Sequence, residues 1–353
     1  MLGDFVRHPI FALFALLSRL QRSWRLVTTL CLTFSALLLA TLLRTYYSQQ
    51  ILPVKPHDGP FFTGCQTPDV NAPRENATFF MLARNQDLEG AIKTLKSLDS
   101  QFNHWARYPI VFLNDDAWNQ SFIDGVSSVA SGRVQFGVVG QTMWGFPEWI
   151  DQDRARVEMD AQAAKGLWLA GNASYHHMCR FYSGMFYDHD LLRSYKWYWR
   201  IEPGVRFTCA ITYDPFVEMV RRGKRYGYVI ALWEIAETVP TLFRKISDWK
   251  AKEKVETTRL WAAMIDFSMV PWPIRSLFRI LKHRDADGNR WNLCHFFNNF
   301  EIADMEFFRS SAYRHLFDTL DHDGGFYYER VRHVAEAPSS RNMLHLLGHG
   351  LTC

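Results

Sequence analysis

Two aromatic-rich stretches constrain the fold of this sequence most: residues 175–186 (YHHMCRFYSGMF) and residues 195–207 (YKWYWRIEPGVRF). They combine large rings with arginine and a Glu-Pro step, a mixture that a strand serving only as core does not need. Glu202 precedes Pro203 and Gly204, two residues that favour a turn. The pattern predicts a strand that ends in a polar turn facing a ligand. A carboxylate in that position can bind a divalent cation.

Further blocks of residues occur in an order that is specific to one family. They are ENATFFMLARN (75–85), YPIVFLNDD (108–116), FPEWI (146–150), ITYDPF (211–216), VPTLF (239–243) and WNLCHFFNNFEIADMEFFRS (291–310). Over residues 70–330 the chain resembles the fungal Golgi α-1,2-mannosyltransferases, glycosyltransferase family 15. The resemblance implies a GT-A-like fold and retaining transfer of mannose from GDP-mannose to mannose-terminated glycans of glycoproteins or glycolipids. It also implies Mn²⁺ as the cofactor.

The composition agrees with a large folded enzyme. The chain has 353 residues, of which 48% are apolar and 15% aromatic, enough for one sizeable core or two modest ones. Its formal net charge is only +4. Because the basic residues are scattered among acidic ones, we expect no nucleic-acid partner.

The amino-terminal region predicts a membrane anchor. Residues 26–43 contain no charged side chain, and as a helix they would extend about 27 Å, just enough to span a bilayer. Arginines concentrate before this segment, so we expect a cytosolic tail at residues 1–25 and a lumenal remainder. The chain would then be a single-pass type II protein of the Golgi membrane. A cleaved signal peptide is the alternative, although the basic region is long and no small-residue cleavage site is evident.

Residues 44–73 contain five prolines and few periodic apolar residues, which predicts a stem. Three glycosylation tripeptides, at Asn76, Asn119 and Asn172, suit a lumenal domain, although such tripeptides also arise by chance. An even set of lumenal cysteines allows three disulfide pairings. The set comprises Cys65, Cys179, Cys209 and Cys294.

From residue 74 the pattern indicates an α/β domain. An apolar strand at 78–82 precedes a helical pattern at 87–98, and a second buried strand at 110–113 stops at Asn114-Asp115-Asp116. Polar residues at strand ends indicate a mixed sheet that binds its ligand at the carboxyl edge. We expect this catalytic domain to cover residues 74–330.

Three residues are candidates for binding the cation and the diphosphate. Glu202 is the metal-ligand candidate, and a salt bridge with a neighbouring arginine is its alternative. Arg84 and Arg180 are candidates for donor binding, because a guanidinium forms paired hydrogen bonds with phosphate oxygens. Each of these arginines could instead form an ordinary salt bridge.

The resemblance supplies roles for three more residues. Tyr175 opens a Tyr-x-x-Met-Cys-Arg block, for which it implies a donor-site hydroxyl; a buried structural tyrosine is the alternative. Glu234 and Glu301 lie among apolar residues, where a carboxylate must be paired or functional. The resemblance places Glu301 as the catalytic carboxylate beside the anomeric carbon and Glu234 as a second active-site acid. A covalent intermediate on Glu301 and front-face attack both remain open.

The sequence also departs from the family pattern. His176 stands where the pattern has arginine, and Ala210 stands where it has aspartate. After residue 330 the resemblance stops abruptly, and we hypothesise that residues 331–353 are read from an unspliced intron. These departures leave a catalytically impaired membrane-anchored paralogue or truncated product as the alternative to an active transferase. A glycoside hydrolase is a further alternative, since paired carboxylates beside aromatic side chains also serve hydrolysis.

Overall fold

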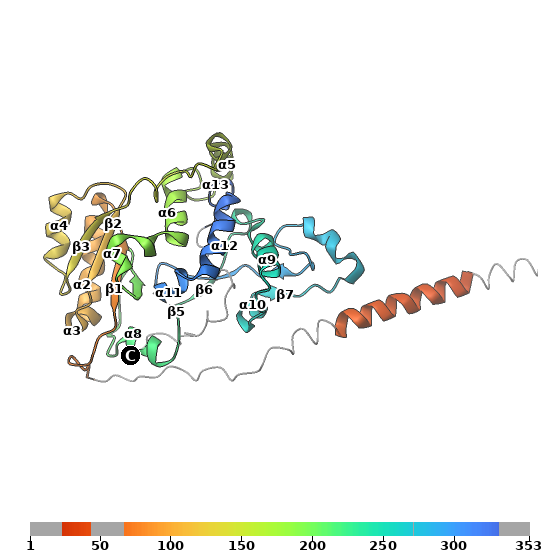
Figure 1. Cartoon of the computed structure of the whole chain (residues 1–353), viewed down its shortest axis with the longest axis horizontal. Helices are drawn as coiled ribbons and strands as arrows, with labels where there is room; N and C mark the ends of the chain where they lie inside the picture. The colour runs from red at the N-terminus through yellow and green to blue at the C-terminus, as the bar shows by residue number, and fades with distance from the viewer. Residues whose placement is uncertain (1–22, 44–66, 271, 332–353) are drawn as a thin grey trace, which may run out of the picture.

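The computed structural model describes residues 23–43, 67–270 and 272–331. The expected cytosolic tail up to residue 22, the expected stem over 44–66 and the atypical tail over 332–353 lie outside these residues, as do Cys65 and Cys353. Helix Ser23–Leu43 coincides with the expected anchor and has a mean hydropathy of 2.2, so it is long and apolar enough to cross a membrane. It projects away from the folded domain (Figure 1).

A six-stranded sheet in the order β3-β2-β1-β4-β10-β5 forms the centre of the domain. Strands β1 to β4 run parallel, and β10 runs antiparallel to β4 and β5. The strands expected at 78–82 and 110–113 are confirmed as β1 and β2, which are almost wholly buried, as expected of strands covered on both faces. The bounds are β1 Ala77–Leu82, β2 Ile110–Asn114, β3 Val134–Val138, β4 Trp197–Arg200, β5 Tyr226–Tyr228 and β10 Glu301–Asp304.

Helices cover both faces of this sheet, because alternate strand residues point to opposite sides. Phe79 and Trp199 belong to the core under one group of helices, and Phe80 and Tyr198 to the core under the other. Figure 1 shows α4 at the left of the sheet and α6 and α12 to its right. The first group comprises α2 Leu88–Leu98, α3 His104–Ala106, α4 Gln120–Ser127 and α8 Pro215–Arg221; the second includes α6 Ala173–Gly184, α11 Met305–Phe308 and α12 Ser311–His322.

The other elements connect or extend these layers. Two small antiparallel ribbons pair β6 Ala231–Trp233 with β9 Cys294–Phe296, and β7 Ile265–Asp266 with β8 Arg290–Trp291. The remaining helices are α5 Gln152–Ala164, α7 Asp190–Arg193, α9 Leu242–Lys252, α10 Arg259–Ala263 and α13 Gly325–Tyr328. Short helical turns are η1 Asn85–Asp87, η2 Asp99–Asn103, η3 Phe186–Asp188, η4 Ala236–Thr238 and η5 Trp272–Ile280.

The strand expected from the first aromatic stretch is wrong, because residues 173–184 form helix α6. Asn172 caps this helix by accepting hydrogen bonds from the backbone of Ser174 and Tyr175. The second stretch is a strand, β4, and its turn follows as expected. Gly204 adopts a φ of 86°, a left-handed conformation that favours glycine. The high content of aromatic residues therefore indicated that residues 175–186 are largely buried. The Asn172 cap and the helical spacing of the apolar residues decided that residues 175–184 form a helix and not a strand.

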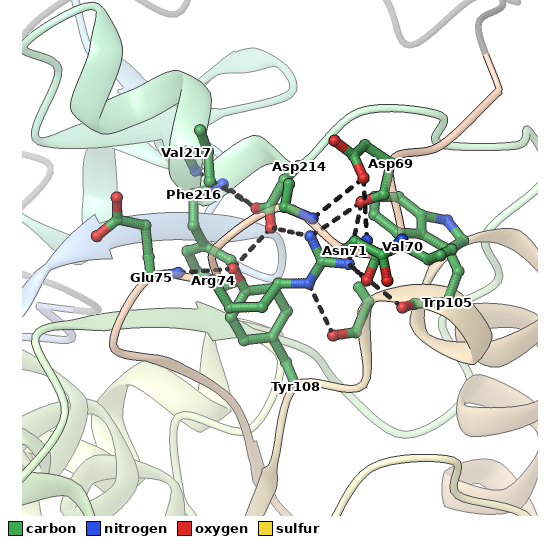
Figure 2. A network of polar contacts seen from close by, with 12 residues as sticks. Asp69, Val70, Asn71, Arg74, Glu75, Trp105, Tyr108, Asp214, Phe216 and Val217 are labelled. Carbon is green, nitrogen blue, oxygen red and sulfur yellow. Dashed lines mark hydrogen bonds and ion pairs between the residues drawn. The ribbon is translucent and has the colours of Figure 1, made fainter.

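An arginine fastens the beginning of the domain to its body, as Figure 2 shows. The Arg74 guanidinium lies 3.8 Å from Asp214 Oδ2 and donates to backbone carbonyls, among them Asp69 O and Ala106 O. Tyr108 donates its hydroxyl hydrogen to the same Asp214 oxygen at 2.7 Å. Asp214 also caps helix α8 by accepting hydrogen bonds from the backbone of Phe216 and Val217. Asp69 and Val70, which the sequence assigned to the stem, thus contact Arg74, the first residue of the expected catalytic domain.

The cysteines expected to be lumenal do not pair among the residues that the structure describes. No disulfide joins any two of Cys179, Cys209 and Cys294. Whichever of these three cysteines pairs with Cys65, the other two would have to form the second disulfide. That second disulfide is absent in all three possible pairings. The expected pairing of the full set is not formed.

Candidate active site

Three polar side chains follow three neighbouring parallel strands. Arg84 comes shortly after β1, Asp115 comes directly after β2, and Glu202 comes shortly after β4. Since parallel strands end at the same edge of a sheet, the fold gathers these side chains on one edge. Helix α6 crosses near this edge and contacts two of them, through Ser174 in its first turn and Tyr182 two turns later.

Glu202 shares one of its carboxylate oxygens between two neighbours. Nε and Nη2 of Arg200 each lie 2.7 Å from Glu202 Oε1, and the Tyr182 hydroxyl donates to the same oxygen at 3.3 Å. The Arg200 guanidinium stacks 3.4 Å above the centroid of the Tyr182 ring. The salt bridge considered as the alternative for Glu202 is therefore present. The second oxygen, Oε2, has no partner among the described residues, and the side chain is 20% exposed.

These carboxylate oxygens decide whether a divalent cation fits the site. No three Asp, Glu, His or Cys side chains gather as a ligand set in the part of the chain that the structure describes. Glu202 Oε2 offers a single hard-oxygen donor. Such a ligand suits a Mg²⁺-type or Mn²⁺-type site in which one carboxylate holds the ion and substrate phosphates complete its shell. Glu202 fits a cation that binds together with a diphosphate.

Glu301 lies within the sheet, below this edge. It is fully buried in β10, opposite Arg200 in the strand register. Tyr198 donates to its Oε1 and Tyr226 to its Oε2, each at 2.7 Å. Burial raises the pKa of Glu301, while nearby Arg200 and the two tyrosine hydroxyls act in the opposite direction. Its role beside the anomeric carbon stays a prediction, and the structure engages both of its oxygens with tyrosines.

Sequence reasoning considered an arginine partner for Glu202 but missed the tyrosines that contact these carboxylates. Tyr198 and Arg200 alternate along β4 and so point to the same face as Glu301. Tyr182 joins them from α6. The period-two pattern of the strand was a usable signal that Tyr198 and Arg200 share a face. The partner of Tyr198, Glu301, lies 103 positions away in the sequence, so local spacing could not reveal that contact.

Arg84 bridges the ends of two strands and helix α6. Its Nη2 donates to Ser174 Oγ at 2.6 Å, and its Nε lies 3.8 Å from Asp115 Oδ1. The side chain is 47% exposed. An accessible guanidinium of this kind can bind phosphate oxygens with two donors. Its geometry therefore supports the role expected from the sequence.

Tyr175 lies beside the same contact. It follows Ser174 in the first turn of α6, and its half-buried ring packs edge-on against Trp168 with centroids 5.9 Å apart. The Arg330 guanidinium lies 5.8 Å from its ring centroid. This position keeps Tyr175 near Arg84. The donor contact of its hydroxyl stays a prediction.

Arg180 and Glu234 are engaged by other groups in the structure. Nε and Nη2 of Arg180 bind the two carboxylate oxygens of Asp321 at 2.7 and 2.8 Å, and both side chains are only 3% exposed. This buried pair joins α6 to α12, so the guanidinium has no open face for a diphosphate. Glu234 follows β6 in a separate ribbon, where its carboxylate accepts from the backbone of Ile235. Both assignments stay predictions that this geometry does not favour.

His176, the departure from the family arginine, is structural here. Its Nδ1 and Nε2 lie 2.5 and 2.7 Å from the carbonyl oxygens of Phe326 and Ala170. Burial lowers the pKa of this imidazole, although the two carbonyl oxygens favour its protonated form. The ring therefore packs α6 against α13 and does not add charge to the sheet edge.

Comparison with known proteins connects this geometry to one family. The sequence profile described as glycolipid 2-alpha-mannosyltransferase matches residues 56–338. The O-glycoside alpha-1,2-mannosyltransferase homolog 4 of Schizosaccharomyces pombe is 40% identical over 301 residues, which are 78% of this chain and 67% of that protein. This chain thus spans about two thirds of that relative's length.

Solved structures show the same fold. Core-mannan synthase A (CmsA/Ktr4) from Aspergillus fumigatus, crystallised in a Mn/GDP form, is 32% identical with a TM-score of 0.67; the match covers 79% of this chain and 74% of that one. The mannosyltransferase Ktr4p from S. cerevisiae, in complex with GDP, is 33% identical with a TM-score of 0.68, covering 82% and 73%. The expected GT-A-like mixed sheet with flanking helices is confirmed. Because the family profile matches well over half of the sequence, the chain belongs to the glycolipid 2-alpha-mannosyltransferase family.

Proposed function

We propose that this protein transfers mannose from GDP-mannose to mannose-terminated glycans of glycoproteins or glycolipids, in α-1,2 linkage and with retention of configuration. The observation that carries the proposal is the sheet edge. There, Glu202 keeps one oxygen available and Arg84 keeps an accessible guanidinium, in a chain about one third identical to a mannosyltransferase solved with GDP. The GDP leaving group is anionic, so its departure needs a carboxylate that holds a cation and a guanidinium that binds phosphate oxygens.

The donor would bind along this edge. Arg84 would hold phosphate oxygens, and Tyr175 would contribute a nearby hydroxyl. Glu202 Oε2 would hold Mn²⁺, as the Mn/GDP form of the Aspergillus relative supports; the cation supplies positive charge for the departing diphosphate. Arg200 fixes the other oxygen of Glu202 and so orients Oε2 before any ligand arrives.

Glu301 would stabilise the reacting sugar electrostatically. Its two tyrosine hydrogen bonds favour this role over direct attack, because neither oxygen faces solvent. A charge in such a dry layer acts over a longer range than it does in water. Glu234 remains the second proposed acid and Arg180 a proposed donor contact, although Arg180 is paired with Asp321 and Glu234 follows a separate ribbon.

The proposed setting is the Golgi membrane. Helix Ser23–Leu43 would anchor the chain with its catalytic domain in the lumen, where the acceptor glycans are found. The length and apolar character of this helix support the anchor.

A transfer assay tests the proposed function. The full chain in detergent micelles is incubated with GDP-mannose, Mn²⁺ and an α-mannoside acceptor, and the product is analysed by NMR. We expect release of GDP and a new α-1,2 linkage. Binding of GDP without any product would support the non-catalytic paralogue, and release of mannose from an α-mannoside without GDP-mannose would support a hydrolase.

A further inference from the structure

An exposed tryptophan stands beside the candidate site. Trp168 lies in the turn between α5 and α6 and is 69% exposed. A large ring in water forgoes the stabilisation that burial would give it. The fold therefore gains little from having tryptophan at this position.

The turn that carries Trp168 is held firmly in place. The Trp168 carbonyl accepts a hydrogen bond from Nη1 of the fully buried Arg330 at 2.8 Å. Backbone hydrogen bonds on either side close the turn, from Leu167 N to Gln162 O and from Asn172 N to Leu169 O. Leu169 has a φ of 57°, a conformation that costs a leucine free energy and that concentrates at binding and active sites. A strained, well-fastened turn thus presents an exposed ring.

The ring is also connected to the candidate site through the start of α6. The Trp168 and Tyr175 rings meet at 74°, with centroids 5.9 Å apart. Tyr175 adjoins Ser174, the residue that Arg84 contacts. A chain of contacts thus connects the Arg84 guanidinium, through Ser174 and Tyr175 at the start of α6, to the Trp168 indole.

We infer that Trp168 is the platform on which the acceptor binds, with a pyranose ring of the mannose-terminated glycan stacked on the indole. The inference rests on the proposed function and names the acceptor subsite of the same site. The C–H face of a pyranose is apolar, so it gains by covering an exposed indole. The acceptor is the end of a large glycan and needs an open approach, whereas the small donor can be held closer to Arg84.

Three variants test this assignment. Trp168→Ala removes the platform, and Trp168→Phe keeps a smaller one. Trp233→Ala removes a tryptophan that is 80% exposed in the β6–β9 ribbon, and it serves as the matched control. For each full-length variant, mannobiose binding is titrated by NMR, GDP binding by calorimetry, and the acceptor KM is measured separately from kcat.

We expect Trp168→Ala to weaken mannobiose binding and to raise the acceptor KM by about tenfold, with Trp168→Phe intermediate. GDP affinity, the thermal unfolding midpoint and the Trp233→Ala variant should match the wild type. Unchanged mannobiose binding in Trp168→Ala overturns the assignment. Loss of GDP affinity also overturns it, because the ring would then belong to the nucleotide. If the wild type transfers mannose but Trp168→Ala binds mannobiose normally, only this inference is refuted. If the wild type binds no mannoside at all, both this inference and the proposed function are refuted.

Discussion

Arg200 holds Glu202 by one oxygen only, since Nε and Nη2 of its guanidinium both contact Oε1 at 2.7 Å. A side-on pairing with both carboxylate oxygens is the more usual arrangement for a guanidinium. Here the arginine fixes the direction of the carboxylate and leaves Oε2 for another partner. The pairing thus permits metal binding, and the two roles considered for Glu202 are compatible.

Replacing Glu202 tests the metal site directly. Glu202→Gln removes the negative charge but keeps the shape of the side chain. We expect Mn²⁺ to tighten GDP binding to the wild type and to have no such effect on the variant, because a neutral amide is a weak ligand for a hard cation. Titration calorimetry with GDP, with and without Mn²⁺, measures the difference.

The control for that experiment is Glu89→Gln. Glu89 is an exposed carboxylate on α2 that pairs with Lys93, so its loss should leave the metal effect intact. If wild-type GDP affinity proves the same with and without Mn²⁺, Glu202 is not a metal ligand.

Replacing Glu301 tests the proposed electrostatic role. Losing a preorganised charge in a dry site lowers the rate on the order of 100-fold to 1000-fold. We expect Glu301→Gln to lower kcat by such a factor with little change in GDP affinity. Steady-state kinetics and calorimetry give the two quantities.

Tyr226→Phe is the companion variant for Glu301. It removes one of the two hydroxyl donors but keeps the carboxylate, so kcat should fall less than in Glu301→Gln. Near-normal transfer by Glu301→Gln would remove this carboxylate from the mechanism.

The sequence predicted those features that local pattern determines. Strands β1 and β2 were predicted because apolar runs end at polar residues, and the position of Glu202 was predicted because Pro203 and Gly204 impose a turn. The partners of buried charges were not predictable in this way. Glu301 meets the Tyr198 hydroxyl across 103 positions of sequence, and no local spacing signals such a contact.

Arg180 illustrates the same limit and gives a third prediction. Its partner Asp321 lies 141 positions away, and the pair is buried. Arg180→Met leaves a buried carboxylate uncompensated, which typically costs about 3 to 5 kcal/mol. We expect a marked fall in the urea midpoint of unfolding. The double variant Arg180→Met with Asp321→Leu should recover much of the loss, since it removes both charges. A stable Arg180→Met that has lost GDP affinity would instead restore Arg180 to the donor site.

His177 gives a prediction about pH. Burial, with smaller contributions from His176 and Arg180, lowers the pKa of His177 to about 4, whereas a histidine in an unfolded chain titrates near 6.5. Between these values the unfolded chain binds more protons, so the contribution of His177 to stability is complete above about pH 6.5 and is lost as the pH falls toward 4.

His177→Gln abolishes this titration and can keep a hydrogen bond to the Tyr327 hydroxyl, which His177 Nδ1 contacts at 2.9 Å. We therefore expect the wild type to lose more stability than the variant between pH 7 and pH 4.5, as measured by urea unfolding. Parallel losses in the two proteins would show that His177 has an ordinary pKa in the folded state.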